Sequence, residues 1–184
     1  MDMNSAEKAG NKKRMSSWPM ILSALIIIAD QLTKFWIAGN VRENTIAKRL
    51  MGDFLWIVHT RNLGIAFSIG DSISSLLRIA FFIVLPAFFI IAAAVYSWKS
   101  EKLETVQRYA IAFIIGGGAG NLIDRIFRPE GVVDFISFSL FGLFGLERFP
   151  TFNIADSAVT VGAALLLISG FLWDGKEKTN GKKG

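Results

Sequence analysis

Four apolar stretches alternate with more polar segments along the chain, and they cover residues 18–38, 79–98, 109–123 and 151–173. A helix of about 20 apolar residues crosses a hydrocarbon core about 30 Å thick, because each residue adds about 1.5 Å. The pattern therefore predicts an α-helical membrane protein with four transmembrane helices. The second stretch contains no charged residue, and Pro86 within it predicts a kink whose freed carbonyl group is satisfied by a neighbouring helix.

The segments between the spans have a different pattern. Residues 39–71 contain turn residues around two short β-branched and aromatic runs, at 53–60 and 65–69, which predicts a small extracytoplasmic β-sheet. Residues 129–150 follow the third span and are expected to form a loop. The apolar part of this loop, residues 139–146, is too short to cross a membrane and is predicted to lie along the membrane interface.

The distribution of charge predicts how the helices are oriented. Most of the net charge of +5 is carried by the two tails, residues 1–17 and 174–184, and an excess of Lys and Arg is typical of cytoplasmic segments. We therefore expect both termini in the cytoplasm and one membrane domain at residues 18–173. The basic residues indicate topology rather than nucleic-acid binding. No small-x-small cleavage site follows the first span, which we interpret as a retained helix and not as a removed signal peptide.

Two residue types are scarce, which limits the possible chemistry. The chain has no Cys and one His, which excludes disulfides, a Cys nucleophile, thiolate metal sites and a cluster of His ligands. We expect neither a metal ion nor a cofactor. His59 is interpreted as a residue of the small sheet.

Acidic residues within the spans lie at one depth. Counted from the cytoplasmic end of its own span, Asp30 lies at roughly 18 Å, Asp124 at about 23 Å and Asp156 at about 26 Å. Asp134, on the outer loop, can reach the same level. An in-membrane charge costs at least a few kcal/mol and is retained only when it is paired or used. The four acids therefore predict a functional site near the extracytoplasmic surface.

Several polar residues are candidates for supporting this site. Asp30 and Lys34 are spaced i, i+4 with the acid first, which favours an ion pair that holds the first helix. Asp124 and Arg125 are adjacent and cannot face each other, so each is expected to pair elsewhere, with Lys34 and with substrate head groups; a purely structural role is equally open. The three asparagines lie beside these charges or beside turns, where Asn often serves as a cap: Asn62, Asn121 and Asn153.

Asp134 and Asp156 have no basic residue within four positions in the sequence. Two carboxylates that meet in a dry environment cannot both ionise, so they share one proton and supply a base and an acid. Such a pair can add water to a peptide carbonyl group. The residues alone leave two alternatives, helix caps or a proton relay. A nucleophilic pair of Ser157 with Lys34 is weaker, because Lys34 is expected to be engaged by Asp30.

Five motifs in sequence order resemble those of one known family. They are Asp30-Gln31-x-Thr33-Lys34, Arg61-Asn62-x-Gly64-x-Ala66-Phe67, Gly120-Asn121-x-x-Asp124-Arg125, Val132-Val133-Asp134-Phe135 and Phe152-Asn153-x-Ala155-Asp156-Ser157. Each motif alone is weak, but five in register with four spans are specific. On these residues the chain is similar to the bacterial lipoprotein signal peptidases, the globomycin-sensitive type II signal peptidases.

The resemblance implies a hydrolase, an intramembrane aspartyl endopeptidase that cuts diacylglyceryl-modified prolipoproteins just before the lipidated cysteine. Asp134 and Asp156 would be its catalytic pair. Asn62, Gly64, Asn121, Arg125 and Asn153 would line the site, whereas Asp30, Lys34 and Asp124 would hold its architecture. It also implies a bacterial inner-membrane location, contact with membrane lipids, inhibition by globomycin-type compounds and a monomeric state.

The third span contains a glycine run at residues 116–120, Gly116-Gly117-Gly118-Ala119-Gly120. Glycine presents a surface without side chains, against which another backbone packs closely. For a peptidase of this kind we expect the glycines to help accommodate the signal helix of the substrate.

Two other functional classes are alternatives to an intramembrane peptidase. Grouped intramembrane acids also occur in proton-coupled carriers, but carriers usually place them at the midplane between internal repeats, and the sequence has neither feature. The other alternative is a metal-dependent hydrolase with Asp134 and Asp156 as magnesium ligands, although two carboxylates alone form a poor site for a hard cation.

Overall fold

The structure is a computed structural model that describes residues 17–64 and 74–180. Its long helical segments are α1 (Trp18–Asn40), a segment made of α2 (Ser75–Ile79), η3 (Ala80–Val84) and α3 (Leu85–Lys99), then α4 (Thr105–Phe127) and α5 (Ile154–Asn180). By length and composition, four helical stretches within them can cross a membrane. The predicted four-helix membrane architecture is therefore confirmed, and the last helix continues past the predicted span end at residue 173.

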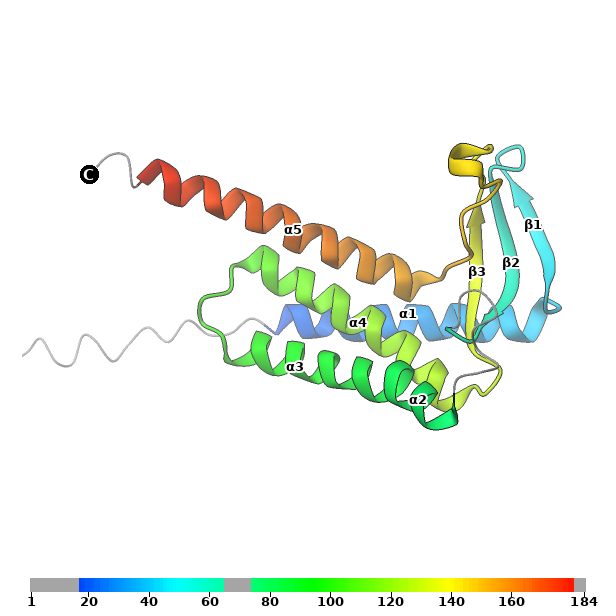
Figure 1. Cartoon of the computed structure of the whole chain (residues 1–184), viewed down its shortest axis with the longest axis horizontal. Helices are drawn as coiled ribbons and strands as arrows, with labels where there is room; N and C mark the ends of the chain where they lie inside the picture. The colour runs from blue at the N-terminus through cyan, green and yellow to red at the C-terminus, as the bar shows by residue number, and fades with distance from the viewer. Residues whose placement is uncertain (1–16, 65–73, 181–184) are drawn as a thin grey trace, which may run out of the picture.

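Helix α4 lies between the other long helices and packs against α1, α3 and α5 (Figure 1). Its glycine run makes this possible, although not in the way predicted. A Cβ at Gly116 would lie 2.9 Å from Ile26 Cβ on α1, one at Gly117 would meet the Ala155 carbonyl oxygen of α5, and one at Gly118 would lie 3.1 Å from Ile90 on α3.

The expectation that these glycines accommodate a substrate helix was therefore wrong. Their surfaces face the protein's own helices, which approach closely because no side chain intervenes. The run determines how the helices pack and, through α5, where Asp156 lies.

The three-stranded sheet has the order β1-β2-β3, with β1 at Thr45–Leu50, β2 at Leu55–Asn62 and β3 at Val132–Phe138, all antiparallel. The predicted sheet after the first helix is confirmed, and the predicted run 53–60 largely coincides with β2. The second predicted run, 65–69, lies outside the described residues.

The third strand comes from the segment predicted to be a loop, so the assignment of Asp134 to a loop was wrong. The run Val132-Val133-Asp134-Phe135-Ile136 has the β-branched and aromatic composition of a strand. Its acid and the neighbouring glycine and proline suggested a loop instead. A register shift between Ile57 and Thr60 of β2 lies beside Asp134, which pairs with Thr60.

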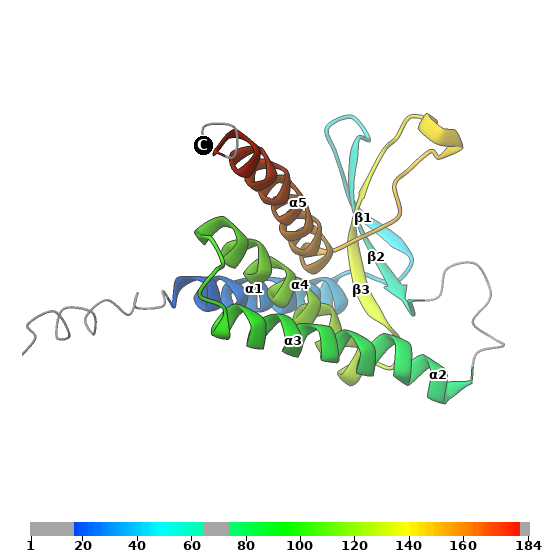
Figure 2. The same ribbon diagram turned by 60° about the vertical axis from the view of Figure 1, so that its left-hand side comes forward.

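The sheet lies across one end of the helical bundle, and the start of α1 and the end of α5 lie at the opposite end (Figures 1 and 2). A buried cluster of Ile37, Val133 and Phe135 joins the end of α1 to β3. Because side chains alternate along a strand, Val133 and Phe135 point to the opposite side of the strand from Asp134. This packing fixes the position of Asp134.

Residues 139–150 contain a short 3₁₀ helix, η4 (Leu143–Gly145). The start of this segment contacts the turn between β1 and β2, because the Ser139 N–H donates to the Phe54 carbonyl oxygen (2.8 Å). Arg148 holds this segment to the sheet, because its Cζ lies 3.7 Å from the Trp56 ring centroid and its Nε donates to Ser137 Oγ (2.9 Å). Phe149 stacks on Phe138 at 4.8 Å. Phe141 remains 76% exposed, and its position at a membrane interface stays a prediction.

The second span is irregular just before Pro86, where η3 is a π-helical segment. In a regular α-helix the Phe82 carbonyl would accept a hydrogen bond from residue 86, but proline has no N–H. Arg125 Nη1 of α4 donates to this carbonyl oxygen at 3.5 Å. This contact confirms that a neighbouring helix supplies a donor to the carbonyl freed by Pro86.

Candidate active site

Asp156 lies in the first turn of α5 and forms a reciprocal cap with Asn153. The Asp156 N–H donates to Asn153 Oδ1 (2.9 Å), and the Asn153 N–H donates to Asp156 Oδ2 (3.1 Å). Such a pair satisfies two N–H groups at the helix start and holds both side chains in one conformation. Asp156 is therefore a helix cap, which was one of the alternatives left by the sequence. Its Oδ1 is not used in the cap and can make a further contact.

Asp134 on β3 is buried and accepts one hydrogen bond at each carboxylate oxygen. Asn153 Nδ2 donates to Oδ1 (2.7 Å), and Asn62 Nδ2 of β2 donates to Oδ2 (3.0 Å). Burial raises the pKa of Asp134 from 3.8 to about 6; the negative charge of Asp156 also raises it, whereas the two amide hydrogen bonds and Lys34 lower it.

Asn153 therefore contacts both acids, through its backbone N–H to Asp156 and through its side-chain amide to Asp134. Asp134 and Asp156 are 22 positions apart in the sequence, one on a strand and the other on a helix. Asn153 fixes the two carboxylates relative to each other. Their proximity, which we expected from the depth of the acids, follows from these two contacts of Asn153.

Asn121 on α4 supports Asp156 from a second direction. Its Nδ2 donates to Asp156 Oδ1 (2.7 Å), and its Oδ1 accepts hydrogen bonds from Lys34 Nζ (2.8 Å) and Asn153 Nδ2 (3.0 Å). Two donors at Oδ1 set the orientation of the amide, so that the NH₂ group must face the carboxylate. Lys34 thereby acts on Asp156 through Asn121.

Lys34 is buried together with two acids from different helices. Its Nζ lies 2.8 Å from Asp30 Oδ2 and 3.1 Å from Asp124 Oδ2, and all three side chains have no exposed surface. Both predicted partners of Lys34 are confirmed. With Asn121, the three acceptors match the three donors of the ammonium group, as burial of a charge requires.

The two acids also join other elements to the site. Asp30 Oδ1 accepts the Ala155 N–H of α5 (3.0 Å), and Asp124 Oδ2 accepts the Val133 N–H of β3 (3.2 Å). One network therefore connects α1 and α4 to the two elements that carry Asp134 and Asp156. The depth of the acids predicted that they lie together, and these contacts join Asp30 to α5 and Asp124 to β3. Their supporting role stays a prediction.

Arg125 and Gly64 both contact Phe82 of the second span. Arg125 Cζ lies 5.5 Å from the Phe82 ring centroid, and Arg125 forms no ion pair within the described part of the chain. Gly64 has a positive φ of 76°, and its N–H donates to Asn62 Oδ1 (2.8 Å). All ten predicted site residues thus lie within or beside one network.

Some members of the network were not predicted. Gln31 Nε2 donates to Asp124 Oδ1 and to the Gly120 carbonyl oxygen, both at 3.0 Å, and Arg128 Nη1 donates to Asp124 Oδ1 at 2.7 Å. Gln31 belongs to a motif noted in the sequence, and its place one residue after Asp30 was an available signal. Arg128 follows Asp124 by four positions, the spacing of an ion pair on one helix face.

The alternative chemistry based on Ser157 receives no support. Its Oγ donates to the Asn153 carbonyl oxygen (2.9 Å), and the three donors of Lys34 are already used. His59 is a buried residue of β2 whose Nδ1 lies 2.7 Å from the Val41 carbonyl oxygen, as the interpretation as a sheet residue predicted. No group of three or more His, Cys, Asp or Glu suited to a metal ion occurs in the described ranges.

A family model described as signal peptidase (SPase) II matches residues 22–172. The lipoprotein signal peptidase of Treponema pallidum is 43% identical over 159 residues, covering 86% of this chain and 85% of that protein. That of Borrelia duttonii is 42% identical over 158 residues, with coverages of 86% and 91%. A bacterial membrane enzyme solved by the in meso method has a TM-score of 0.71 at 31% identity, covering 83% of this chain and 92% of that one. The chain therefore belongs to the signal peptidase II family.

Proposed function

We propose that the protein is an intramembrane aspartyl endopeptidase that removes the signal peptide from diacylglyceryl-modified prolipoproteins by cleaving before the lipidated cysteine. Its catalytic residues are Asp134 and Asp156. The single observation that supports this assignment best is the double contact of Asn153, whose backbone and side chain hold the two carboxylates. The family membership supports the reaction class.

The pair works with one shared proton. The ionised carboxylate accepts a proton from water while the water oxygen attacks the scissile carbonyl carbon, and the protonated carboxyl group donates its proton to the carbonyl oxygen. Breakdown of the tetrahedral intermediate returns that oxygen to a carbonyl and delivers a proton to the leaving amine nitrogen. The raised pKa of Asp134 supports this cycle, because a carboxyl group with a pKa of about 6 can both hold and release a proton near neutral pH.

The supporting residues have distinct roles in this proposal. Asn62, Asn121 and Asn153 hold the carboxylates through amide hydrogen bonds. Lys34, Asp30 and Asp124 form the buried ionic base of the site. Gly64 and Arg125 line its edge, where Arg125 offers unpaired donors to the substrate backbone or head groups.

The proposed location is the bacterial inner membrane, with both termini in the cytoplasm and the active site near the outer face. This orientation is supported by the basic tails and by the position of the sheet at the opposite end of the bundle from the start of α1 and the end of α5 (Figure 1). We further expect a monomer in contact with membrane lipids, inhibition by globomycin-type compounds and no binding of nucleic acid.

The proposal is tested by incubating purified protein with a lipid-modified precursor and with its unmodified form, each with and without chelator. Cleavage of the lipidated precursor immediately before the modified cysteine, unaffected by chelator, is the expected result. Loss of cleavage in chelator would instead favour the metal-dependent hydrolase. Absence of cleavage by a folded wild-type protein would refute the peptidase assignment.

A further inference from the structure

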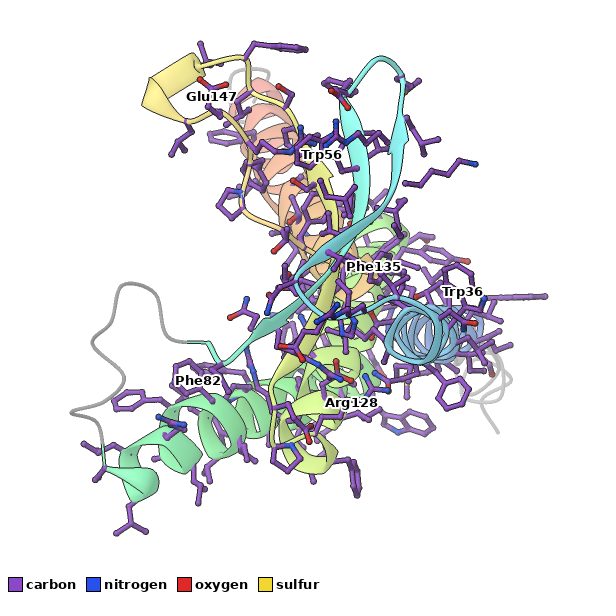
Figure 3. All side chains as sticks on the ribbon, turned by 90° about the vertical axis from the view of Figure 1, so that its right-hand side faces the viewer. Trp36, Trp56, Phe82, Arg128, Phe135 and Glu147 are labelled. Atoms are coloured by element: carbon purple, nitrogen blue, oxygen red, sulfur yellow. The ribbon has the colours of Figure 1, made fainter. Side chains whose placement is uncertain are left out.

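Phe82, on the π-helical segment of the second span (Figure 3), contacts Arg125 of α4 and Gly64, which follows the end of β2. The Phe82 ring lies 5.5 Å from Arg125 Cζ of α4. It also lies against Gly64, where an added Cβ would be 2.7 Å from Phe82 Cε1. No sequence motif discussed above includes Phe82.

The contact with Gly64 connects Phe82 to Asp134 through two hydrogen bonds of Asn62. Gly64 N–H donates to Asn62 Oδ1 (2.8 Å), and Asn62 Nδ2 donates to Asp134 Oδ2 (3.0 Å). The positive φ of Gly64 and the aromatic ring beside it leave little room for this turn to move. A smaller side chain at position 82 would allow the turn, and with it Asn62, to shift.

Phe82 also restricts the position of the positively charged side chain of Arg125. Its guanidinium group lies near the face of the Phe82 ring, and Nη1 donates to the Phe82 carbonyl oxygen (3.5 Å), which Pro86 leaves without its α-helical donor. Arg125 lies one helical turn after Asn121, whose Nδ2 donates to Asp156 Oδ1 (2.7 Å), and its charge interacts with Asp156, Asp134 and Asp124. None of the ion pairs in the described residues joins Arg125 to any of these acids.

This separation matters because a direct ion pair would favour ionisation of both carboxylates and so remove their shared proton. We propose that Phe82 is a positioning residue, which holds Arg125 beside the Asp134–Asp156 pair without letting it form an ion pair with either acid. The irregular helix at Pro86 contributes to this positioning, because it frees the Phe82 carbonyl oxygen to which Arg125 donates. The inference rests on the proposed function and adds to it a residue that acts through Arg125 and Asn62.

The test compares four variants in the full-length protein with lipid-modified precursor as the substrate. Phe82→Leu removes the ring, Phe82→Tyr retains it, and Pro86→Ala restores an N–H that competes for the Phe82 carbonyl oxygen. Phe81→Leu is the matched control, because Phe81 is 59% exposed on the same segment. The measurements are kcat and KM as a function of pH, and the thermal midpoint of each variant.

We expect Phe82→Leu to lower kcat about tenfold and to move the pH-rate profile about one unit toward lower pH, because the released guanidinium favours the ionised pair. Titratable and charged groups on the elements around the pair are unchanged in these variants, so they do not account for a shift. They are Asp30 and Lys34 on α1, His59 and Arg61 on β2, and Asp124 and Arg128 on α4. Phe82→Tyr and Phe81→Leu should keep kcat within about twofold of wild type.

Pro86→Ala should lower kcat, as Phe82→Leu does, but should leave the thermal midpoint equal to or higher than that of wild type, because it makes the helix regular. A packing role alone would instead move activity and stability together, with no change in the pH profile. Unchanged kcat and an unshifted profile in Phe82→Leu, or a loss of kcat explained by a lower thermal midpoint alone, would overturn the inference. Inactive wild-type protein would instead refute the proposed function.

Discussion

Asn153 and Asp156 cap each other at the start of α5, with the Asp156 N–H 2.9 Å from Asn153 Oδ1 and the Asn153 N–H 3.1 Å from Asp156 Oδ2. A cap normally only satisfies the helix start. Here the same Asn153 also donates to Asp134 (2.7 Å), so the cap determines the spacing between two acids on different elements. The same residue therefore caps the helix and positions the proposed catalytic pair.

The first prediction is that Asp134→Asn and Asp156→Asn each lower cleavage at least about a thousandfold, because an amide can neither accept the proton of water nor hold the shared proton. Cleavage of a lipidated precursor is measured together with thermal unfolding. Asp53→Asn is the control, since its side chain is 56% exposed at the far end of the sheet. Near wild-type turnover in either site variant would disprove the dyad.

The second prediction concerns pH and stability. The pKa of Asp134 is raised from 3.8 in the unfolded reference to about 6 in the folded protein, so the folded state binds more protons in this interval. Stability from this group is present below pH 3.8 and is lost as pH rises through about 6. Relative to Asp134→Asn, wild type should lose up to about 3 kcal/mol across the window.

Denaturation of both proteins between about pH 4 and pH 7 measures this difference. The two lost or altered amide contacts in the variant contribute equally at every pH, so only the change with pH is diagnostic. A constant difference across the range would show that Asp134 keeps an ordinary pKa in the folded protein.

The third prediction is that Asp30→Ala lowers stability by about 3–5 kcal/mol, because it leaves Lys34 buried with one carboxylate and frees the Ala155 N–H. Asp53→Asn removes the charge of an exposed pair with Arg49 (3.6 Å) and should cost at most about 1 kcal/mol. Folded yield and thermal unfolding are the measurements. Wild-type stability combined with lost cleavage would place Asp30 among the catalytic residues instead.

The fourth prediction separates two glycines in the membrane helices. Gly117→Ala places a methyl group against the Ala155 carbonyl oxygen and Val159, so it should displace the first turn of α5 and lower both stability and activity. The overpacking should cost about 1–3 kcal/mol. Gly170→Ala has no atom within 4 Å of the added Cβ and should be neutral or stabilising by up to about 1 kcal/mol. Equal behaviour of the two variants would contradict the packing of α4 against α5.

The sequence predicted the features that depend on local composition. Four spans follow from runs of apolar residues, and the Asp30–Lys34 pair follows from helical spacing. Strand β3 could not be assigned because its acid, which needs partners from β2 and Asn153, made the segment look like a loop. The partners of the glycines and the role of Phe82, one of sixteen Phe residues, depend on tertiary contacts that no local pattern contains.

The last prediction concerns how substrate is selected. A peptide bond reaches Asp134 and Asp156 only if its chain enters the outer part of the membrane, where an extended backbone loses hydrogen bonds to water. A diacylglyceryl group compensates for this loss, since each buried methylene contributes about 0.8 kcal/mol. We expect lipid modification, more than side chains around the bond, to decide what is cut.

Phe141 tests whether the segment 139–150 participates in this selection. Its ring is 76% exposed and stacks on Phe54 at 6.2 Å, so it presents an apolar surface beside the sheet. Phe141→Asp should raise KM for a lipidated precursor severalfold without unfolding the helices, because a carboxylate resists transfer to an apolar membrane interface. Phe141→Leu, which keeps an apolar side chain, should remain near wild type. Unchanged KM in Phe141→Asp would exclude only a role of the segment 139–150 in substrate selection. Equal rates for lipidated and unlipidated precursors with wild-type protein would show that lipid modification does not decide what is cut.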